Sequence, residues 1–377
     1  GSATRHRATV LCVGYQCDLA LLDVDADDDN EPDEFWRDVA PLALTEALPA
    51  LGDEVLTVGF PRGGDQISVT KGVVSRLSVH SYVRRYWALL AIQVDASINS
   101  GNSGGPTIAP SGDVVGVAFS HLRNSQAIGY IIPSTVVTFF LADYAKFGDC
   151  RFTGITCGVQ TLENQSQRHY LRLPAAVKGV RVADVVPVGV WSSVLRVNDV
   201  ITSVNGVDVA NDGTVALRDA ERVSWSYVLD SVHRGDTVRV GVYRDGAHHT
   251  LSVVAEYRHG LVPSIDGFDA HPSYAIFGGA VFAVLSIPLL RSAFGKEWSA
   301  KAPVDLLHAL YTHRQQRVDD QRVVLLHLLA SKLTVGYSVG LRAALLHTAQ
   351  DVEVRHLRHL VDIVLRERAA DAYFKFG

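Results

Sequence analysis

Gly101-Asn102-Ser103-Gly104-Gly105-Pro106 places one serine between glycines in a short turn. Glycine permits backbone angles that other residues avoid, and it leaves no side chain to block a substrate. A serine hydroxyl exposed beside free backbone N–H groups is the arrangement that an acyl-transfer nucleophile needs. A G-x-S-G string alone also occurs in ordinary turns. The longer run from Asp95 to Pro106 is more specific, and it predicts that Ser103 is a nucleophile.

The composition is that of a globular protein. The 377 residues suffice for two or three domains, with 47% hydrophobic and 20% charged residues. The net charge of −5 argues against a nucleic-acid partner.

The cysteines and histidines predict no metal site and no cofactor. Cys12, Cys17, Cys150 and Cys157 form no C-x-x-C pair and are too few for a disulfide framework, which favours an intracellular or organellar compartment. The histidines are scattered, without cysteine or carboxylate company at ligand spacing. The acid-rich stretch 23–38 is interpreted as a solvated loop rather than a calcium loop, because the EF-hand spacing is absent.

The first third of the chain predicts a β barrel or sandwich. Its short Val-, Ile- and Leu-rich segments are separated by turn residues. We expect strands at 8–13, 18–24, 54–60, 67–77, 88–94, 114–120 and 129–132. Pro133 then opens a helix over 134–146, and Gly148 ends it.

Two further units follow. In 154–257 we expect strands at 179–186, 199–204, 237–243 and 250–255, a short helix at 190–195 and a longer one at 221–232. The third unit begins at Pro272 with an uncharged run to Leu290, interpreted as a buried strand and turn rather than a membrane span. Helices are expected at 303–313 and 352–368.

Several motifs resemble the Deg/HtrA serine proteases. They are the run from Asp95 to Pro106, Cys17-Asp18-Leu19-Ala20-Leu21-Leu22, Lys71-Gly72-Val73-Val74-Ser75-Arg76, Gly59-Phe60-Pro61-Arg62-Gly63-Gly64 and Ile128-Gly129-Tyr130-Ile131-Ile132-Pro133. The resemblance implies a mainly β chain: a chymotrypsin-like double β-barrel followed by two PDZ domains. It assigns 1–148 to the protease, 154–262 to the first PDZ domain and 272–377 to a second, incomplete one. The layout is most similar to the plant and algal branch.

The resemblance also implies catalytic roles. Ser103 matches the nucleophile, Asp18 the triad acid, and the N–H groups of Gly101 and Ser103 the oxyanion hole. The family's general base lies in an Ala-His-Val segment before the aspartate, whereas His6, within Arg5-His6-Arg7, lacks that pattern. Because the chain also contains no methionine, we expect an N-terminally truncated chain, inactive by itself, with the catalytic histidine upstream.

Binding residues are implied as well. Ser97, six residues before Ser103, matches the floor of the primary pocket, and its wall is formed by Gly116, Val117 and Ala118. An uncharged, apolar pocket predicts cleavage after small or medium aliphatic residues. The peptide carboxylate in the first PDZ domain is expected at Tyr170, Leu171, Arg172 and Leu173, with helix 221–232 as the other wall. Gly278-Gly279 is either a second carboxylate loop or a bend entering a core strand.

The leading functional hypothesis is an ATP-independent serine endopeptidase of protein quality control that forms an acyl-enzyme and needs no cofactor. Its partners would be unfolded or C-terminal peptide segments, and the resemblance implies a homo-oligomer, such as a trimer, in a chloroplast or mitochondrion, with the nucleus left open. The alternative is a non-catalytic PDZ adaptor or holdase that retains the protease fold. A membrane-anchored protease using 274–290 is a third hypothesis, although no transmembrane span is expected.

Overall fold

The computed structural model describes residues 7–24, 33–36, 39–60, 66–82, 87–98, 101–121, 128–257, 261–263, 271–330, 332–337, 343–366 and 373–376. Contacts between Cα atoms divide the chain into two units. Unit 1 comprises residues 1–184 and 194–257, and unit 2 comprises residues 185–193 and 258–377.

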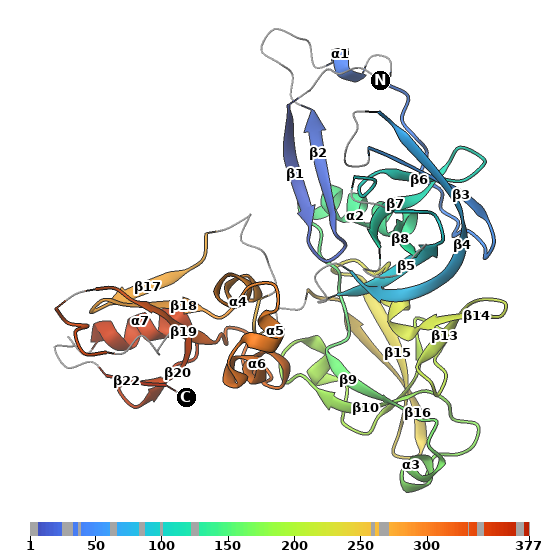
Figure 1. The fold of residues 1–377 in the computed structure, drawn as a ribbon. Helices are drawn as coiled ribbons and strands as arrows, with labels where there is room; N and C mark the ends of the chain where they lie inside the picture. The colour runs from blue at the N-terminus through green and yellow to red at the C-terminus, as the bar shows by residue number, and fades with distance from the viewer. Residues whose placement is uncertain are drawn as a thin grey trace. The chain divides into compact units, whose positions relative to one another are not determined.

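A closed β-barrel forms the centre of unit 1 (Figure 1). Its strands follow the order β3-β4-β5-β8-β7-β6, and every pairing is antiparallel. They are β3 (Glu54–Gly59), β4 (Ser68–Ser81), β5 (Ala88–Val94), β6 (Pro106–Ile108), β7 (Val114–His121) and β8 (Gly129–Pro133). The predicted barrel strands are confirmed, except that β6, only three residues long, carries too little pattern to be predicted.

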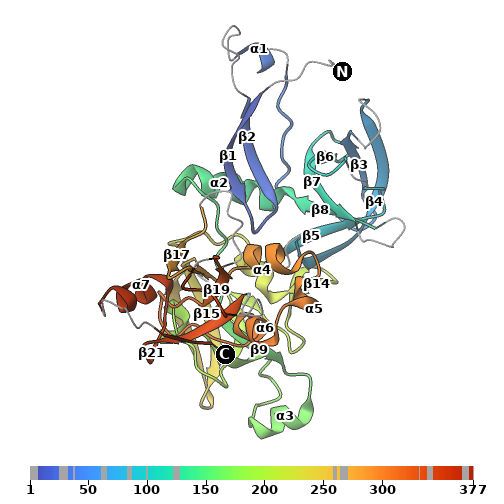
Figure 2. The same cartoon turned by 60° about the vertical axis from the view of Figure 1, so that its left-hand side comes forward.

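A β-hairpin and a helix pack together beside this barrel (Figure 2). The hairpin joins β1 (Ala8–Gly14) to β2 (Leu19–Val24), and the helix is α2 (Ser134–Phe147). Cys12 and Cys17 of the hairpin share a core with Phe139 and Phe140 of α2. The predicted helix end is confirmed, because Gly148 has a φ of 75° and donates its N–H to the Tyr144 carbonyl at 2.8 Å. A further short helix, α1, spans Asp33–Trp36.

The rest of unit 1 is a second antiparallel sheet with the order β16-β15-β11-β10-β9, and β12 pairs with β11. Its strands are β9 (Cys157–Thr161), β10 (Val180–Val185), β11 (Val200–Val204), β12 (Val207–Asp208), β15 (Thr237–Arg244) and β16 (Ala247–Val254). Helix α3 (Gln165–Tyr170) and the hairpin of β13 (Thr214–Arg218) and β14 (Glu221–Ser224) accompany this sheet. The one-turn helix η1 (Val190–Ser193) belongs to unit 2 by its contacts.

The helix predicted over 221–232 is wrong. Residues Glu221–Ser224 form strand β14, and only Trp225–Leu229 are helical, as the 3-10 turn η2. The apolar residues of this stretch show helical spacing only when those of β14 and those of η2 are counted together. Asp219, with a φ of 29°, turns the chain back, so that Val223 pairs with Val215 and both are buried. Cross-strand pairing therefore overrides the helical pattern.

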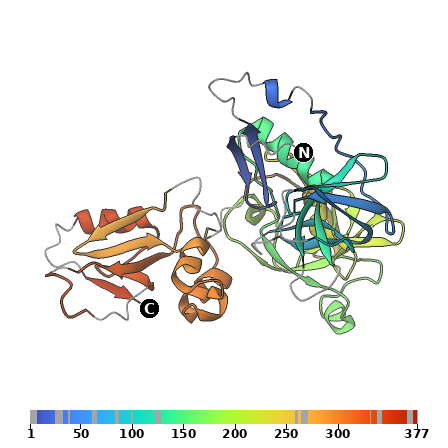
Figure 3. The same cartoon turned by 45° about the horizontal axis from the view of Figure 1, so that its top comes forward.

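Unit 2 is a sheet with the order β17-β18-β19-β20-β21, and β22 pairs with β20 (Figure 3). Its strands are β17 (Tyr274–Phe277), β18 (Ala280–Val284), β19 (Val323–Leu328), β20 (Ala344–Ala349), β21 (Val352–Glu353) and β22 (Phe374–Phe376). Its helices are α4 (Ile287–Phe294), α5 (Trp298–Lys301), α6 (Val304–Tyr311) and α7 (Leu357–Arg366), of which α7 packs on the sheet. In the described ranges, no helix combines the length and apolar character needed to cross a membrane.

Two details of unit 2 refine the sequence analysis. Gly278 and Gly279, with φ of 56° and 90°, form a two-residue hairpin turn that pairs Phe277 with Ala280, which is the bend entering a core strand. The helix predicted from residue 352 begins only at Leu357, because residues 352–353 pair with β20 instead.

Candidate active site

Ser103 lies on an exposed turn between β5 and β6. The flanking residues Gly101 and Gly104 have φ of 118° and 88°, values that side-chain-bearing residues rarely adopt. Within the described ranges, the N–H groups of Gly101 and Ser103 donate no hydrogen bond. The turn thus presents one hydroxyl and two available backbone donors within three residues, as the sequence motif predicts.

The barrel holds this turn from two sides. Gly104 donates its N–H to the Ala118 carbonyl at 2.7 Å, and Ala118 donates its N–H to the Gly105 carbonyl at 3.0 Å. On the other side, the Phe60 N–H donates to the Gly101 carbonyl at 3.2 Å. A Cβ atom at Gly105 would lie 1.9 Å from the Val58 carbonyl oxygen, so this position accepts only glycine. Backbone hydrogen bonds therefore hold the turn that carries Ser103 to β7 and to the residue that follows β3.

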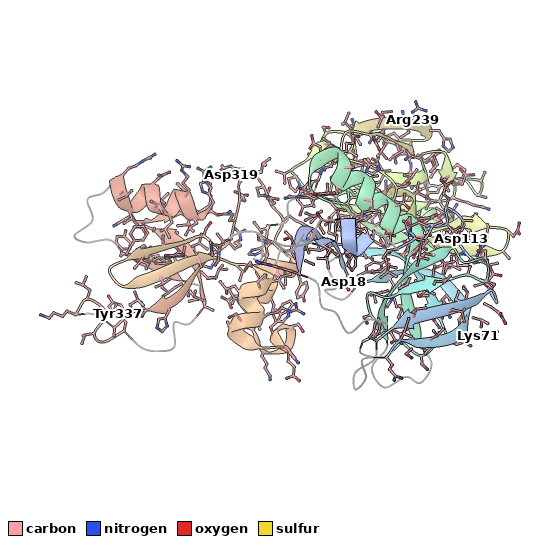
Figure 4. All side chains as sticks on the ribbon, turned by 90° about the horizontal axis from the view of Figure 1, so that it is seen from above. Asp18, Lys71, Asp113, Arg239, Asp319 and Tyr337 are labelled. Carbon is pink, nitrogen blue, oxygen red and sulfur yellow. The ribbon has the colours of Figure 1, made fainter. Side chains whose placement is uncertain are left out.

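Asp18 lies at the end of the turn that joins β1 and β2, and it is exposed (Figure 4). Its φ is 56°, a left-handed conformation that aspartate tolerates better than most residues. The preceding Cys17 is fully buried and donates its N–H to the Gly14 carbonyl at 3.1 Å, which anchors the turn. Asp18 is thus held on the hairpin and Ser103 on the barrel, while His6 lies outside the described residues.

Tyr82 links the Asp18 turn electrostatically to the barrel. The pKa of Tyr82 is raised well above its ordinary value, mainly because its hydroxyl is buried. The nearby charges of Asp230, Cys17 and Asp18 raise this pKa further. Tyr82 shares the hydrophobic core of the hairpin and α2. Sequence reasoning did not single out this tyrosine, because nothing in its local pattern indicates that it lies beside the turn carrying Asp18.

The predicted pocket wall lies next to the nucleophile turn. Gly116, Val117 and Ala118 belong to β7, and Ala118 is the residue bonded to Gly104 and Gly105. A Cβ atom at Gly116 would lie 2.1 Å from the Ile132 carbonyl oxygen, so the strands approach closely there. Ser97 is exposed between buried neighbours, and its carbonyl accepts a hydrogen bond from the Thr70 hydroxyl at 3.2 Å.

Asn102 is a residue of the motif to which the sequence assigned no role. Its side chain is buried, and its Oδ1 atom has no hydrogen-bond partner in the described part of the chain. Its carbonyl accepts the Gly105 N–H at 2.9 Å, which closes the turn around Ser103. In the sequence, the one indication that Asn102 matters is its place beside Ser103 in the motif. Its burial could not be predicted, because it depends on the strands that surround the turn.

The segment expected to bind a peptide carboxylate, Tyr170 to Leu173, precedes a strand that lies inside the sheet rather than at its edge. Tyr170 ends α3 and is highly exposed, while Leu171, Arg172 and Leu173 form the turn after it. The strand that follows, β10, pairs with β9 on one side and β11 on the other. A peptide strand adds only to an open sheet edge, so β10 has no edge to offer. On this side of the sheet, β9 is the outermost described strand.

Family models match both ends of the chain. Residues 1–117 match a model described as a trypsin-like peptidase domain, and residues 262–377 match a model described as a PDZ domain. In solved structures, the HtrA-type protease AlgW with a tripeptide superposes with a TM-score of 0.50 at 24% identity, over 67% of this chain and 77% of that one. This likeness shows the fold.

Protease Do-like 2, chloroplastic, of Arabidopsis thaliana is 40% identical over 371 residues, which are 96% of this chain and 58% of that protein. Protease Do-like 4, mitochondrial, of the same plant is 33% identical over 97% of this chain and 65% of its own length. The chain therefore spans about three fifths of the length of these two relatives. "Putative protease Do-like 13" of the same plant is 32% identical over the whole chain and 71% of its own length. The sequence identity, the trypsin-like domain and the PDZ domain together show that this chain belongs to the Deg/HtrA family of Do-like serine proteases.

Proposed function

We propose that the full-length protein is an ATP-independent serine endopeptidase of protein quality control. The observation that carries this proposal is the exposed Ser103 beside two available N–H donors, on a turn fixed by Ala118. Ser103 Oγ attacks the scissile carbonyl, and the resulting oxyanion accepts hydrogen bonds from the N–H groups of Gly101 and Ser103. The carbon–nitrogen bond then breaks, the amine leaves with a proton, and water hydrolyses the acyl-enzyme.

The general base is proposed to be a histidine outside these 377 residues. Neither the hairpin 8–24 that carries Asp18 nor the turn 101–106 contains a histidine. Asp18 would accept a hydrogen bond from that histidine, fix its tautomer and stabilise its protonated form after it takes the Ser103 proton. Asp18 is exposed at the end of the turn between β1 and β2.

Unfolded casein without nucleotide tests the activity. We expect the full-length protein to cleave it and the product pattern to be unchanged by ATP. If the folded full-length protein leaves casein intact but keeps it from aggregating, the adaptor or holdase function replaces the endopeptidase.

Specificity is expected to depend on Ser97. Ser97→Asp places a carboxylate at the proposed pocket floor, where it would pair with a basic side chain at the cleaved bond. We expect the ratio of kcat/KM for arginine over valine peptides to rise at least ~10-fold, since one good charge pair contributes at least about 1.4 kcal/mol. Steady-state kinetics on matched peptides measure it, with Ser75→Asp on the exposed face of β4 as the control. An unchanged ratio would place the pocket floor elsewhere.

We propose that peptides with a free C-terminus bind along β9. The peptide would continue the sheet beyond β9 as an added antiparallel strand. Amide chemical shifts on adding such a peptide should move most in β9, and the same peptide with an amidated C-terminus should bind at least ~10-fold more weakly. Chemical-shift changes confined to Tyr170–Leu173 would contradict binding along β9 and would support the peptide site predicted from the sequence.

The relatives' names support an organellar location, since they include chloroplastic and mitochondrial proteases. We propose the same kind of compartment here, and a homo-oligomer assembled through the protease domain. Fractionation of organelles and sedimentation of the full-length protein test these two points separately.

A further inference from the structure

The edge of β5 at Leu90 has backbone groups that the barrel sheet leaves unpaired. Strand β8 pairs with β5 only from Ile92 to Val94, with Ile131 opposite Ile92. Continuing this register by two residues sets Leu90 opposite Pro133, which has no N–H group. Buried backbone groups need hydrogen-bond partners, and Leu90 is fully buried, so its free N–H and C=O must be satisfied from elsewhere.

Two side chains supply these partners. Asp230 Oδ2 accepts the Leu90 N–H at 3.0 Å, and the Tyr82 hydroxyl donates to the Leu90 carbonyl. Tyr82 directly follows β4 of the barrel, whereas Asp230 directly follows η2, in the segment that leads to β15 of the second sheet. Elements β5 and η2 are in contact within unit 1. The barrel therefore depends on the second sheet to satisfy one of its own backbone donors.

Among the residues that the structure describes, Asp230 forms no ion pair with a cationic side chain. Burial of its carboxyl group raises its pKa to about 8, and the hydrogen bond from Leu90 offsets this only in part. The titratable groups that sense its charge are Tyr82, on the barrel side, and Tyr227, on η2. Strand β5 itself contains no charged residue. The pair of Asp143 and His233, at 2.9 Å, lies at the same junction of barrel and second sheet.

We propose that Asp230, as a neutral carboxylic acid, is the docking residue by which the 154–257 sheet holds the β5 edge, so that acid tightens this contact and base loosens it. The segment held in this way leads along the chain to Ser97 and then to the Ser103 turn. A docked sheet thus fixes the strand that precedes the nucleophile, and ionisation of Asp230 would release it.

The direction of the pH effect follows from proton binding. An undocked, solvated aspartate has a pKa near ~3.9, while the docked one titrates at about 8. Between these values the docked form holds one more proton, so the docking constant falls by up to ~10-fold per pH unit as pH rises. The loss begins near pH 4 and is complete above pH 8. The side-chain oxygen in Asp230→Asn can still accept the Leu90 N–H, but the amide cannot ionise.

Hydrogen exchange at the Leu90 amide tests the proposal. Protection, corrected for the intrinsic exchange rate, is measured from pH 5 to pH 8 in the wild type, in Asp230→Asn, and in Asp245→Asn as the matched control. Asp245 is exposed in a turn of the same sheet with a φ of 51°, which asparagine also adopts. Any contribution of Asp143 and His233 to the pH dependence of Leu90 protection is the same in all three proteins, so it cancels when two proteins are compared as a ratio.

We expect the ratio of protection, Asp230→Asn over wild type, to rise at least ~10-fold between pH 5 and pH 8, with a level ratio for Asp245→Asn. Asp230→Ala should lower Leu90 protection at least ~10-fold already at pH 5, because the acceptor is gone. A ratio for Asp230→Asn that stays level with pH would show that Asp230 is ionised when docked, and would overturn the proposal. Unchanged protection in a folded Asp230→Ala would show that Asp230 does not hold the β5 edge.

Discussion

Ser103→Ala should abolish cleavage of casein by the full-length protein, with kcat lowered by on the order of 10⁵- to 10⁶-fold. The substitution removes the oxygen that we propose forms the acyl-enzyme, while the N–H groups of Gly101 and position 103 remain. The residual rate should come from the oxyanion donors and substrate binding alone. Steady-state and single-turnover cleavage of one fluorogenic peptide would measure the loss.

Ser111→Ala is the control for this experiment. Ser111 is exposed in the turn before β7, and among the described residues its hydroxyl forms hydrogen bonds with Asp113 alone. It should leave kcat within about twofold of the wild type. Because Ser103 is also exposed, Ser103→Ala should leave the unfolding temperature unchanged. Cleavage that persists in Ser103→Ala at more than about a hundredth of the wild-type rate would assign the nucleophile to another residue.

Asp143→Ala should destabilise unit 1 by up to about 3–5 kcal/mol, because it removes a buried carboxylate and leaves its partly buried partners without it. Asp143, on α2, is fully buried. Its Oδ1 lies 2.9 Å from His233 Nδ1, its Oδ2 accepts the Arg151 N–H at 2.9 Å, and Arg234 lies 3.6 Å away. The ring of His233 also stacks on Phe139, so the loss should spread into the core. Urea unfolding followed by far-ultraviolet circular dichroism measures it.

Asp149→Ala is the matched control for burial. Asp149 pairs with Arg234 and Arg151, but its side chain is 39% exposed. Exposed pairs contribute little, so we expect a loss of at most about 1 kcal/mol. Equal losses for Asp143→Ala and Asp149→Ala would mean that the buried carboxylate is not a major source of stability at this junction.

The barrel was predictable because its strands carry local signals. The stretches at β3, β5 and β8 are apolar and bounded by turn residues, and α2 has a proline before it and a glycine after it. Two elements were not predictable for opposite reasons. Strand β6 is too short to show a period, and the apolar spacing of 221–232 suits a helix although the hairpin partner β13 makes its first part a strand.

The candidate site divides in the same way. Ser103 and its flanking glycines stand in one contiguous motif, so their turn could be located from the sequence. The sheet edge to which we propose that a peptide binds could not be located in this way, because the sequences of the strands do not specify their order in the sheet. Residues 170–173 precede a strand, as expected, but only the sheet shows that β10 is internal and β9 external.

The sequence by itself determined the turn that carries Ser103 and the positions of most strands, because these depend on residues that are neighbours along the chain. The tertiary structure decided which groups that are distant in the sequence come into contact. It brought Ala118 to the turn of Ser103, and it brought Asp230 to a backbone N–H that lies 140 positions earlier. Such contacts follow from sheet closure and domain docking, where unsatisfied backbone groups and buried charges select their partners, and no local pattern encodes those distances.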